Sequence, residues 1–214
     1  MQRFFKTGPG QYGEGDEFMG LKVSTIRQLI KSYYDLSYGD LTTLLIHPVH
    51  EIRMTGLLIL VKQYQKNRIK NPDHFVEIYL DHLDYVNNWD LVDSSCRDLL
   101  GDYLLTRPRD LLYQLAKENN IWKQRIAIVS TYPMIKKGDF TDAFAISLLL
   151  FAVKEDILQK GIGWMLREIV THGGLADFES FVKSHADKIP RKTLSIAIQD
   201  LDKNQKEYFR GLLG

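Results

Sequence analysis

The chain has 214 residues, of which 44% are hydrophobic and 26% charged, so it can bury a core and does not resemble a disordered segment. The formal net charge of +1 is too small to indicate nucleic-acid binding by itself, and any basic surface must come from the placement of charges. The single cysteine, Cys96, excludes an intramolecular disulfide and a cysteine-based zinc cluster.

Location and domain organisation follow from the same features. The longest apolar stretch, residues 143–153, is too short to cross a bilayer, and the N-terminal residues lack the apolar region of a signal peptide. With only one cysteine, a reducing compartment is the default, so we expect a cytoplasmic protein. The composition is uniform along the chain, which favours one domain over residues 1–214.

Helix signals are frequent and strand signals are weak, so the sequence predicts an all-α protein. The glycine-rich residues 1–20 are expected to form an irregular arm. Apolar spacing, helix-start prolines and Asn or Asp caps predict about twelve helices after it. The predicted ranges are 23–36, 39–46, 49–66, 73–80, 88–105, 108–118, 120–135, 139–152, 155–172, 174–184, 190–202 and 204–212.

One charged residue recurs near the start of five successive helical segments. These residues are Arg53, Asp93, Arg125, Lys160 and Lys192, at intervals of about 32 to 40 residues, near the repeat length of HEAT and armadillo arrays. Stacked helix pairs bring equivalent positions into register along one surface. The pattern therefore predicts an α-solenoid of about six HEAT-like helix pairs with a concave basic groove for a polyanion.

The predicted helix 155–172 displays an aromatic residue among cations. Lys160, Trp164 and Arg167 share the side opposite the apolar stripe, because they are spaced four and three residues apart. A tryptophan on a polar face suggests a ligand contact. Packing of Trp164 on a neighbouring repeat is the alternative, since large aromatic side chains are usually mostly buried.

The predicted helix 88–105 carries Trp89 and Asp93 one turn apart, so both project to the same side. At the edge of an apolar stripe, the Asp93 carboxylate would be partly desolvated, which suits the stabilisation of a developing positive charge. In the alternative interpretation, Asp90 and Asp93 are acids of the first helical turn, favoured by the helix dipole, and Asn87 or Asn88 is the cap.

Arg125 falls on the side of its predicted helix that should be buried, and a buried guanidinium needs a partner. An internal acid could supply it, with Asp93 on the adjacent repeat as the nearest candidate. A bound phosphate is the other possibility.

Four segments in this order resemble the AlkD-type DNA alkylation repair glycosylases, which are built from HEAT-like repeats. The segments are "FMGLKVSTIRQL", "NNWDLVDSS", "NNIWKQRIAI" and "LQKGIGWMLREI", and the resemblance runs from about Phe18 to the C-terminus. The family's usual N-terminal helix has no counterpart in the glycine-rich arm. The resemblance implies an α-solenoid that cradles duplex DNA and hydrolyses the N-glycosidic bond of cationic N3- or N7-alkylated purines.

On this resemblance the catalytic aspartate falls on Asp93, the two substrate-side tryptophans on Trp89 and Trp164, and a DNA-contacting arginine on Arg125. Expected DNA contacts are Arg53, Arg125, Lys160, Arg167 and Lys192. The chemistry needs no metal or cofactor, because alkylation already makes the purine a cationic leaving group. We expect a monomer whose partner is duplex DNA, with no role at a membrane.

Two other functions stay open: a nucleic-acid-binding relative with weak or lost catalysis, and a HEAT-type scaffold for protein partners. A metal site at His47 and His50 is disfavoured because their spacing around Pro48 matches no zincin pattern. Thiol catalysis by Cys96 is disfavoured because it falls in an apolar stripe.

Overall fold

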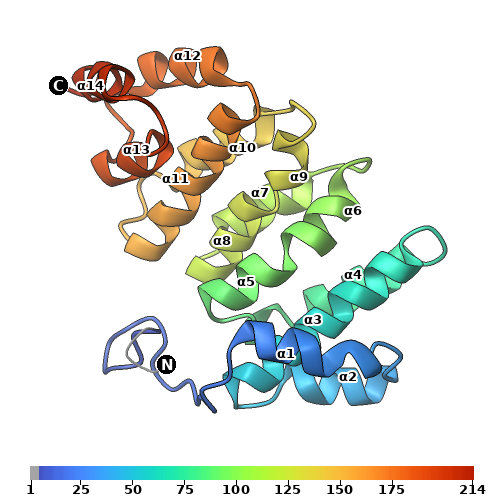
Figure 1. Cartoon of the computed structure of the whole chain (residues 1–214). Helices are drawn as coiled ribbons and strands as arrows, with labels where there is room; N and C mark the ends of the chain where they lie inside the picture. The colour runs from blue at the N-terminus through green and yellow to red at the C-terminus, as the bar shows by residue number, and fades with distance from the viewer. Residues whose placement is uncertain (1–4) are drawn as a thin grey trace. The chain divides into compact units, whose positions relative to one another are not determined.

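The structure is a computed structural model that describes residues 5–214. Over this range the chain is all-α, as predicted, and the one extended contact is an isolated parallel bridge between Glu17 and Val49. The chain divides into two compact units, Met1–Tyr103 and Leu104–Gly214 (Figure 1). The single domain expected over residues 1–214 stays a prediction.

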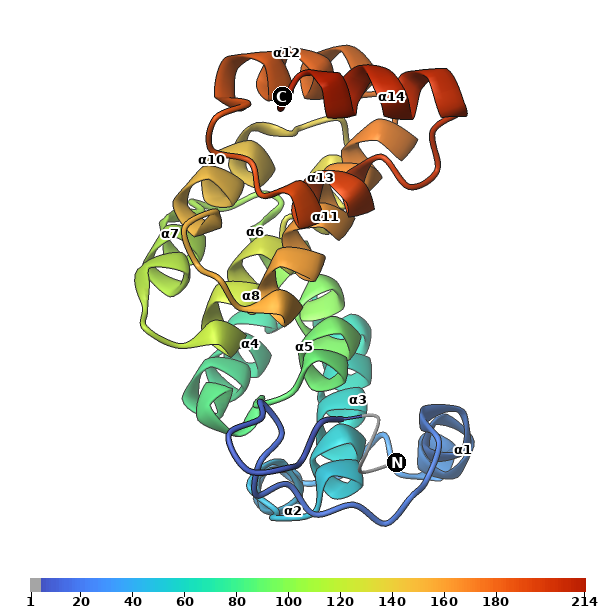
Figure 2. The ribbon, with the colours of Figure 1, turned by 90° about the vertical axis from the view of Figure 1, so that its left-hand side faces the viewer.

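The first unit is built around α3, whose side chains are buried on nearly all sides. Gly56 allows the close approach of α2, because a Cβ atom there would lie 3.0 Å from Cβ of Leu44. In Figure 2, α3 runs beside α4 and α5. The elements are α1 (Val23–Leu29), the 3₁₀ turn η1 (Ile30–Ser32), α2 (Tyr38–Leu45), α3 (His50–Asn67), α4 (Pro72–Asp81), η2 (Leu83–Tyr85), α5 (Trp89–Ser95) and the π-helical η3 (Arg97–Gly101).

The second unit is built around α11, which packs against α8 and α13. Gly163 permits the close contact with α13, since a Cβ atom there would lie 2.8 Å from the carbonyl oxygen of Thr193. After α6 (Asp102–Leu104), which crosses the boundary, the helices are α7 (Asp110–Lys117), α8 (Ile121–Val129), α9 (Tyr132–Ile135), α10 (Thr141–Leu150), α11 (Asp156–Thr171), α12 (Leu175–His185), α13 (Arg191–Ala197) and α14 (Lys203–Gly211).

Two long predicted helices are interrupted. The range 88–105 contains a π-helical segment, in which the backbone N–H of Gly101 donates to the carbonyl of Cys96, five residues earlier. The range 120–135 breaks between α8 and α9. Pro133 explains that break, because it has no N–H for a continuing helix and is favoured in a first turn, where it stands in α9.

The arm was expected over residues 1–20, of which residues 1–4 lie outside the described part of the chain. From residue 5 to residue 21 the chain is irregular, and this segment, here called the arm, is attached to the start of α3. The buried carboxylate of Glu51 accepts hydrogen bonds from the backbone N–H groups of Met19, Gly20 and Leu21, at 2.9, 2.7 and 3.1 Å. Gly20 has a φ of +87°, a conformation that favours glycine. The arm is therefore held by a charged side chain rather than by regular structure.

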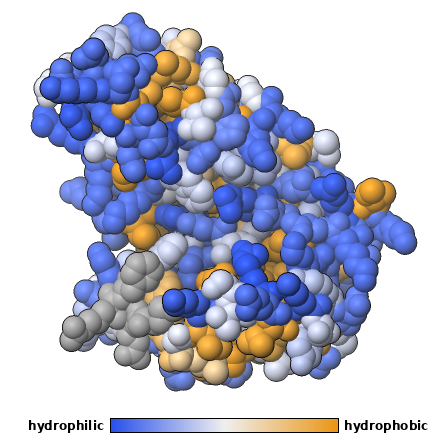
Figure 3. All heavy atoms as spheres, in the orientation of Figure 1, coloured by the Kyte–Doolittle hydropathy of each residue, from blue (hydrophilic) through white to orange (hydrophobic). Residues whose placement is uncertain are grey.

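From the end of the arm to the residue after η1, the chain leaves three apolar side chains at the surface. Met19, Leu29 and Tyr33 are each more than half exposed. Figure 3 shows a hydrophobic area at the surface in the region of α1. No helix between residues 5 and 214 is both long and apolar enough to cross a membrane.

Candidate functional site

The N-terminus of α5 carries the two residues expected at the centre of the site. Asn88 caps this helix, because its side-chain oxygen accepts a hydrogen bond of 2.9 Å from the backbone N–H of Trp89. Of the two cap candidates, Asn88 is thus the correct one. Trp89 and Asp93 lie one turn apart and are half-buried, whereas the three residues between them are buried. Both side chains therefore retain access to solvent.

An aromatic column from the arm covers one ring face of Trp89. The ring of Phe5 is stacked on Trp89 with centroids 5.8 Å apart, and Phe18 is stacked on Phe5 at 4.8 Å. His50 lies beside both phenylalanines, at 5.1 and 4.6 Å. Phe5 itself is buried. The column thus fixes one side of the indole inside the first unit.

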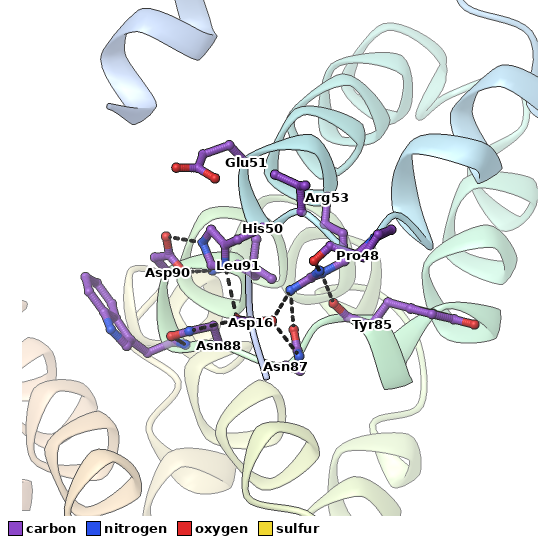
Figure 4. A network of polar contacts seen from close by, with 12 residues as sticks. Asp16, Pro48, His50, Glu51, Arg53, Tyr85, Asn87, Asn88, Asp90 and Leu91 are labelled. Carbon is purple, nitrogen blue, oxygen red and sulfur yellow. Dashed lines mark hydrogen bonds and ion pairs between the residues drawn. The ribbon is translucent and has the colours of Figure 1, made fainter. Parts of the chain in front are cut away.

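His50 also belongs to a buried group of charged side chains, here called the His50 cluster: Asp16, His50, Arg53 and Asp90 (Figure 4). Nε2 of His50 lies 2.9 Å from Oδ2 of Asp90, and Nδ1 lies 3.3 Å from Oδ2 of Asp16. The Asp16 carboxylate also forms an ion pair of 2.6 Å with Arg53. One imidazole therefore joins a carboxylate of the arm to a carboxylate of α5.

These contacts shift two pKa values in opposite directions. Burial alone would lower the pKa of His50, but its hydrogen bonds to Asp16 and Asp90 outweigh burial and raise that pKa above 6.5. Burial would raise the pKa of Asp16, but His50 and Arg53 outweigh it and lower that pKa below 3.8. Between these values both residues are charged, so the cluster is a set of buried ion pairs.

Arg53 is held in structural contacts, which argue against its expected role as a DNA contact. Its side chain is only 4% exposed. A guanidinium has five N–H donors, and five acceptors lie within 3.1 Å of them, so no donor is left for a phosphate. The acceptors are the carbonyl oxygens of His47, Pro48 and Tyr85 and the side-chain oxygens of Asp16 and Asn87.

The histidines of "HPVHE" also have structural contacts. His47 Nδ1 accepts a hydrogen bond from the backbone N–H of Val49, and both ring nitrogens of His50 face carboxylates. A signal for His50 exists in the sequence, because it precedes Met54 and Leu57 by four and seven residues, on the buried stripe of α3. No comparable signal marks Asp16, whose partners in the cluster are at least 34 residues away.

In the second unit, Arg125 lies on the buried side of α8, as predicted. Its Nη1 donates to the carbonyl oxygen of Ile157 at the start of α11. Gly161 makes room for it, because a Cβ atom there would lie 2.7 Å from the same Nη1. One partner of the guanidinium is thus a backbone carbonyl, which the periodicity of α8 alone does not indicate.

Lys160 of α11 and Lys192 of α13 come together on one carboxylate. Both ammonium groups form ion pairs with Asp156, and both side chains are about half exposed. The three charges leave a net positive surface where the two helices meet. This pairing supports the expectation that repeat-equivalent cations gather, within the second unit, on one surface.

Trp164 and Arg167 lie further along α11, and both are half-buried. Nε1 of Trp164 donates to Glu168 of the same helix at 2.8 Å. Arg167 contacts the side chains of Gln199 and Asp200, at 3.3 and 3.5 Å. Trp164 is therefore neither buried in the core nor fully exposed to solvent, and its role at a substrate stays a prediction.

Comparisons with known proteins agree with the resemblance carried by α5, α8 and α11. The family model described as "DNA alkylation repair enzyme" matches residues 1–201. The solved structure of a predicted DNA alkylation repair enzyme from Enterococcus faecalis superposes with a TM-score of 0.70 at 16% identity, over 95% of this chain and 93% of that one. No curated protein sequence matches significantly. Because the family model covers nearly the whole chain, this protein belongs to the DNA alkylation repair enzyme family.

Proposed function

We propose that this protein binds duplex DNA and hydrolyses the N-glycosidic bond of purines alkylated at N3 or N7. The observation that carries the proposal is the pairing of Trp89 and Asp93. They share one face of α5 and stay partly accessible, although the residues between them are buried. The chain belongs to a family that repairs alkylated DNA. A negative carboxylate beside an indole can stabilise the positive charge that develops on the sugar when the base leaves.

Hydrolysis of this N-glycosidic bond requires little beyond the negative charge of Asp93. An alkylated purine is already cationic, so it can leave without a general acid, and the sugar becomes oxocarbenium-like as the bond breaks. Asp93 would stabilise the positive sugar and orient the attacking water. Trp89 would contact the cationic nucleotide through the accessible part of its half-buried indole.

We assign DNA binding in the second unit to Lys160, Lys192 and Arg167, whose charged groups are at least partly exposed. Lys and Arg contacts to phosphates release counterions, and this gives affinity without base preference. Arg125 is assigned a supporting role, because its buried guanidinium joins α8 to the start of α11, the helix that carries Lys160.

The test is single-turnover release of 7-methylguanine from duplex DNA by the wild type and by Asp93→Asn. The substitution keeps the size of the side chain and removes its charge, so the rate should fall by about two orders of magnitude or more. DNA affinity should change little, since a carboxylate does not hold phosphate. The matched control is Asp98→Asn, which removes an exposed carboxylate of η3 and should leave the rate unchanged.

A second candidate is a DNA-binding relative that does not excise bases. The observation that favours it is the stack of Phe5 on Trp89, which leaves at most one ring face for a nucleotide. Release of no base above background by the wild type, together with salt-sensitive DNA binding, would replace the first candidate by this one. Equal rates of Asp93→Asn and wild type would exclude Asp93 as the catalytic residue.

A further inference from the structure

We infer that the arm is a positioning element for the N-terminus of α5, acting through Asp16 and Phe5. The inference rests on the proposed function, because it explains how Trp89 and Asp93 are held in place for that reaction. Neither Asp16 nor Phe5 is assigned contact with the substrate. Both act through residues of α5 or of the segment before it.

The first line of evidence is the contact between Asp16 and the segment before α5. Its two carboxylate oxygens accept hydrogen bonds from the side-chain amides of Asn87 and Asn88, at 3.2 and 3.3 Å. Asn88 in turn caps α5 through the N–H of Trp89. Asp16 thus orients the amide group that starts the helix (Figure 4).

His50 provides a second link between the same elements. It lies between Asp16 of the arm and Asp90 in the first turn of α5. The groups that face this imidazole are therefore two carboxylates, with Arg53 behind Asp16 and the rings of Phe5 and Phe18 beside it. In its protonated form His50 can donate to both carboxylates at once.

The second line of evidence is the aromatic column. Trp89 is the first residue of α5, and its half-buried ring would have several rotamers on a bare surface. The planes of Phe5 and Trp89 differ by 25°, and those of Phe5 and Phe18 by 15°, so the three rings form a continuous stack. The stack supports the indole from one side.

The arm is built as a fixed part of the unit rather than as a removable lid. Lifting it would leave Arg53 without its carboxylate and Glu51 without three N–H donors, while both residues are about 4% exposed. An arm that lifted in each cycle would have to break these charged contacts every time. The structure therefore favours positioning over a gate that opens in each cycle.

The experiment uses protein labelled with 5-fluorotryptophan, in which the ¹⁹F resonance of Trp89 is assigned with Trp89→Phe. The variants are Phe5→Leu, which keeps an apolar side chain but removes the stack, and Asp16→Asn, which keeps the shape but removes the charge. Matched controls are Phe75→Leu on α4 and Asp35→Asn, an exposed acid paired with Lys66. Phe5→Tyr serves as the conservative variant that restores the stack.

Both test variants should shift or broaden the Trp89 resonance, and both should slow single-turnover base release by about tenfold or more while duplex affinity stays within about twofold. The two controls should do neither, and Phe5→Tyr should restore rate and resonance. A Trp89 resonance unchanged in both test variants overturns the inference, as does an unchanged rate. If the wild type releases no base, the proposed function fails instead, and the Trp89 resonance alone decides whether the arm positions the ring.

Discussion

His50 and Asp90 are joined by a contact of 2.9 Å between Nε2 and Oδ2, and both side chains are less than a tenth exposed. The contact joins the first residue of α3 to the first turn of α5. Since Asp16 lies at the other ring nitrogen, only the protonated form of His50 can donate to both carboxylates at once. Stability should therefore depend on pH in a predictable direction.

A histidine whose pKa is raised on folding contributes stability that is fully present below pH 6.5. This stability is lost as the pH rises through the pKa of the folded state. Asp16, whose pKa is lowered, contributes stability that is present above 3.8 and is lost as the pH falls through its folded pKa. The cluster should be most stabilising between these two values. We expect the free energy of unfolding of the wild type to fall as the pH rises above 6.5, through the raised pKa of His50.

Chemical denaturation at each pH measures this, with His50→Gln as the comparison. The glutamine side chain does not titrate. The free energy of unfolding of the variant should therefore not decline above pH 6.5 as that of the wild type does. Parallel pH profiles of the two proteins would contradict a role of His50 in this pH dependence.

Arg53→Met tests the conclusion that Arg53 is structural. The substitution removes one partner of a buried ion pair, the guanidinium that lies 2.6 Å from the Asp16 carboxylate, which should cost about 3–5 kcal/mol of unfolding free energy. The control is Arg68→Met at the end of the same helix, whose exposed side chain lies 3.7 Å from Asp102 and should contribute about 0–1 kcal/mol. A stable Arg53→Met protein with a reduced salt dependence of DNA binding would restore Arg53 as a phosphate contact.

The helices were predictable because their signals are local. Pro72 at the start of α4, Asp202 at the cap of α14 and the apolar spacing of α11 each lie within a few residues of the structure that they determine. The pairing of Trp89 with Asp93 was predictable for the same reason. A spacing of four residues on a helix means one shared face.

The burial of Arg53 was not predictable from that spacing. Its position in the helix resembles that of Lys160, and both follow the start of a helix by a few residues. Arg53 is buried because Asp16 reaches it from 37 residues away, through an arm with no periodic pattern. Lys160 pairs with Asp156 of its own helix and stays about half exposed.

Gly163→Ala tests the close contact of α11 with α13. The new Cβ would lie 2.8 Å from both the Thr193 carbonyl oxygen and Cβ of Ile196, and neither atom belongs to a flexible chain end. We expect a loss of about 1–3 kcal/mol, measured by chemical denaturation. Gly211→Ala, on α14, is the control. Its Cβ would meet nothing within 4 Å, so its stability should be unchanged or slightly raised.

Asp156→Asn tests whether Lys160 and Lys192 belong to a DNA-binding surface. In the wild type, the Asp156 carboxylate partly neutralises the charges of both ammonium groups. Removing its charge should strengthen duplex binding and steepen the dependence of affinity on salt, because the freed cations can displace more counterions from phosphates. Replacing Lys160 or Lys192 by Ala should have the opposite effect, by about one phosphate contact each.

The control for the change in net charge is Asp177→Asn, an exposed first-turn acid of α12 in the same unit. It alters the overall charge by the same amount but frees neither lysine, so its effect on affinity should be clearly smaller. Fluorescence anisotropy with a labelled duplex at several salt concentrations measures all of these slopes. Equal gains from Asp156→Asn and Asp177→Asn would mean that only the net charge matters. The two lysines would then lose their assignment as phosphate contacts.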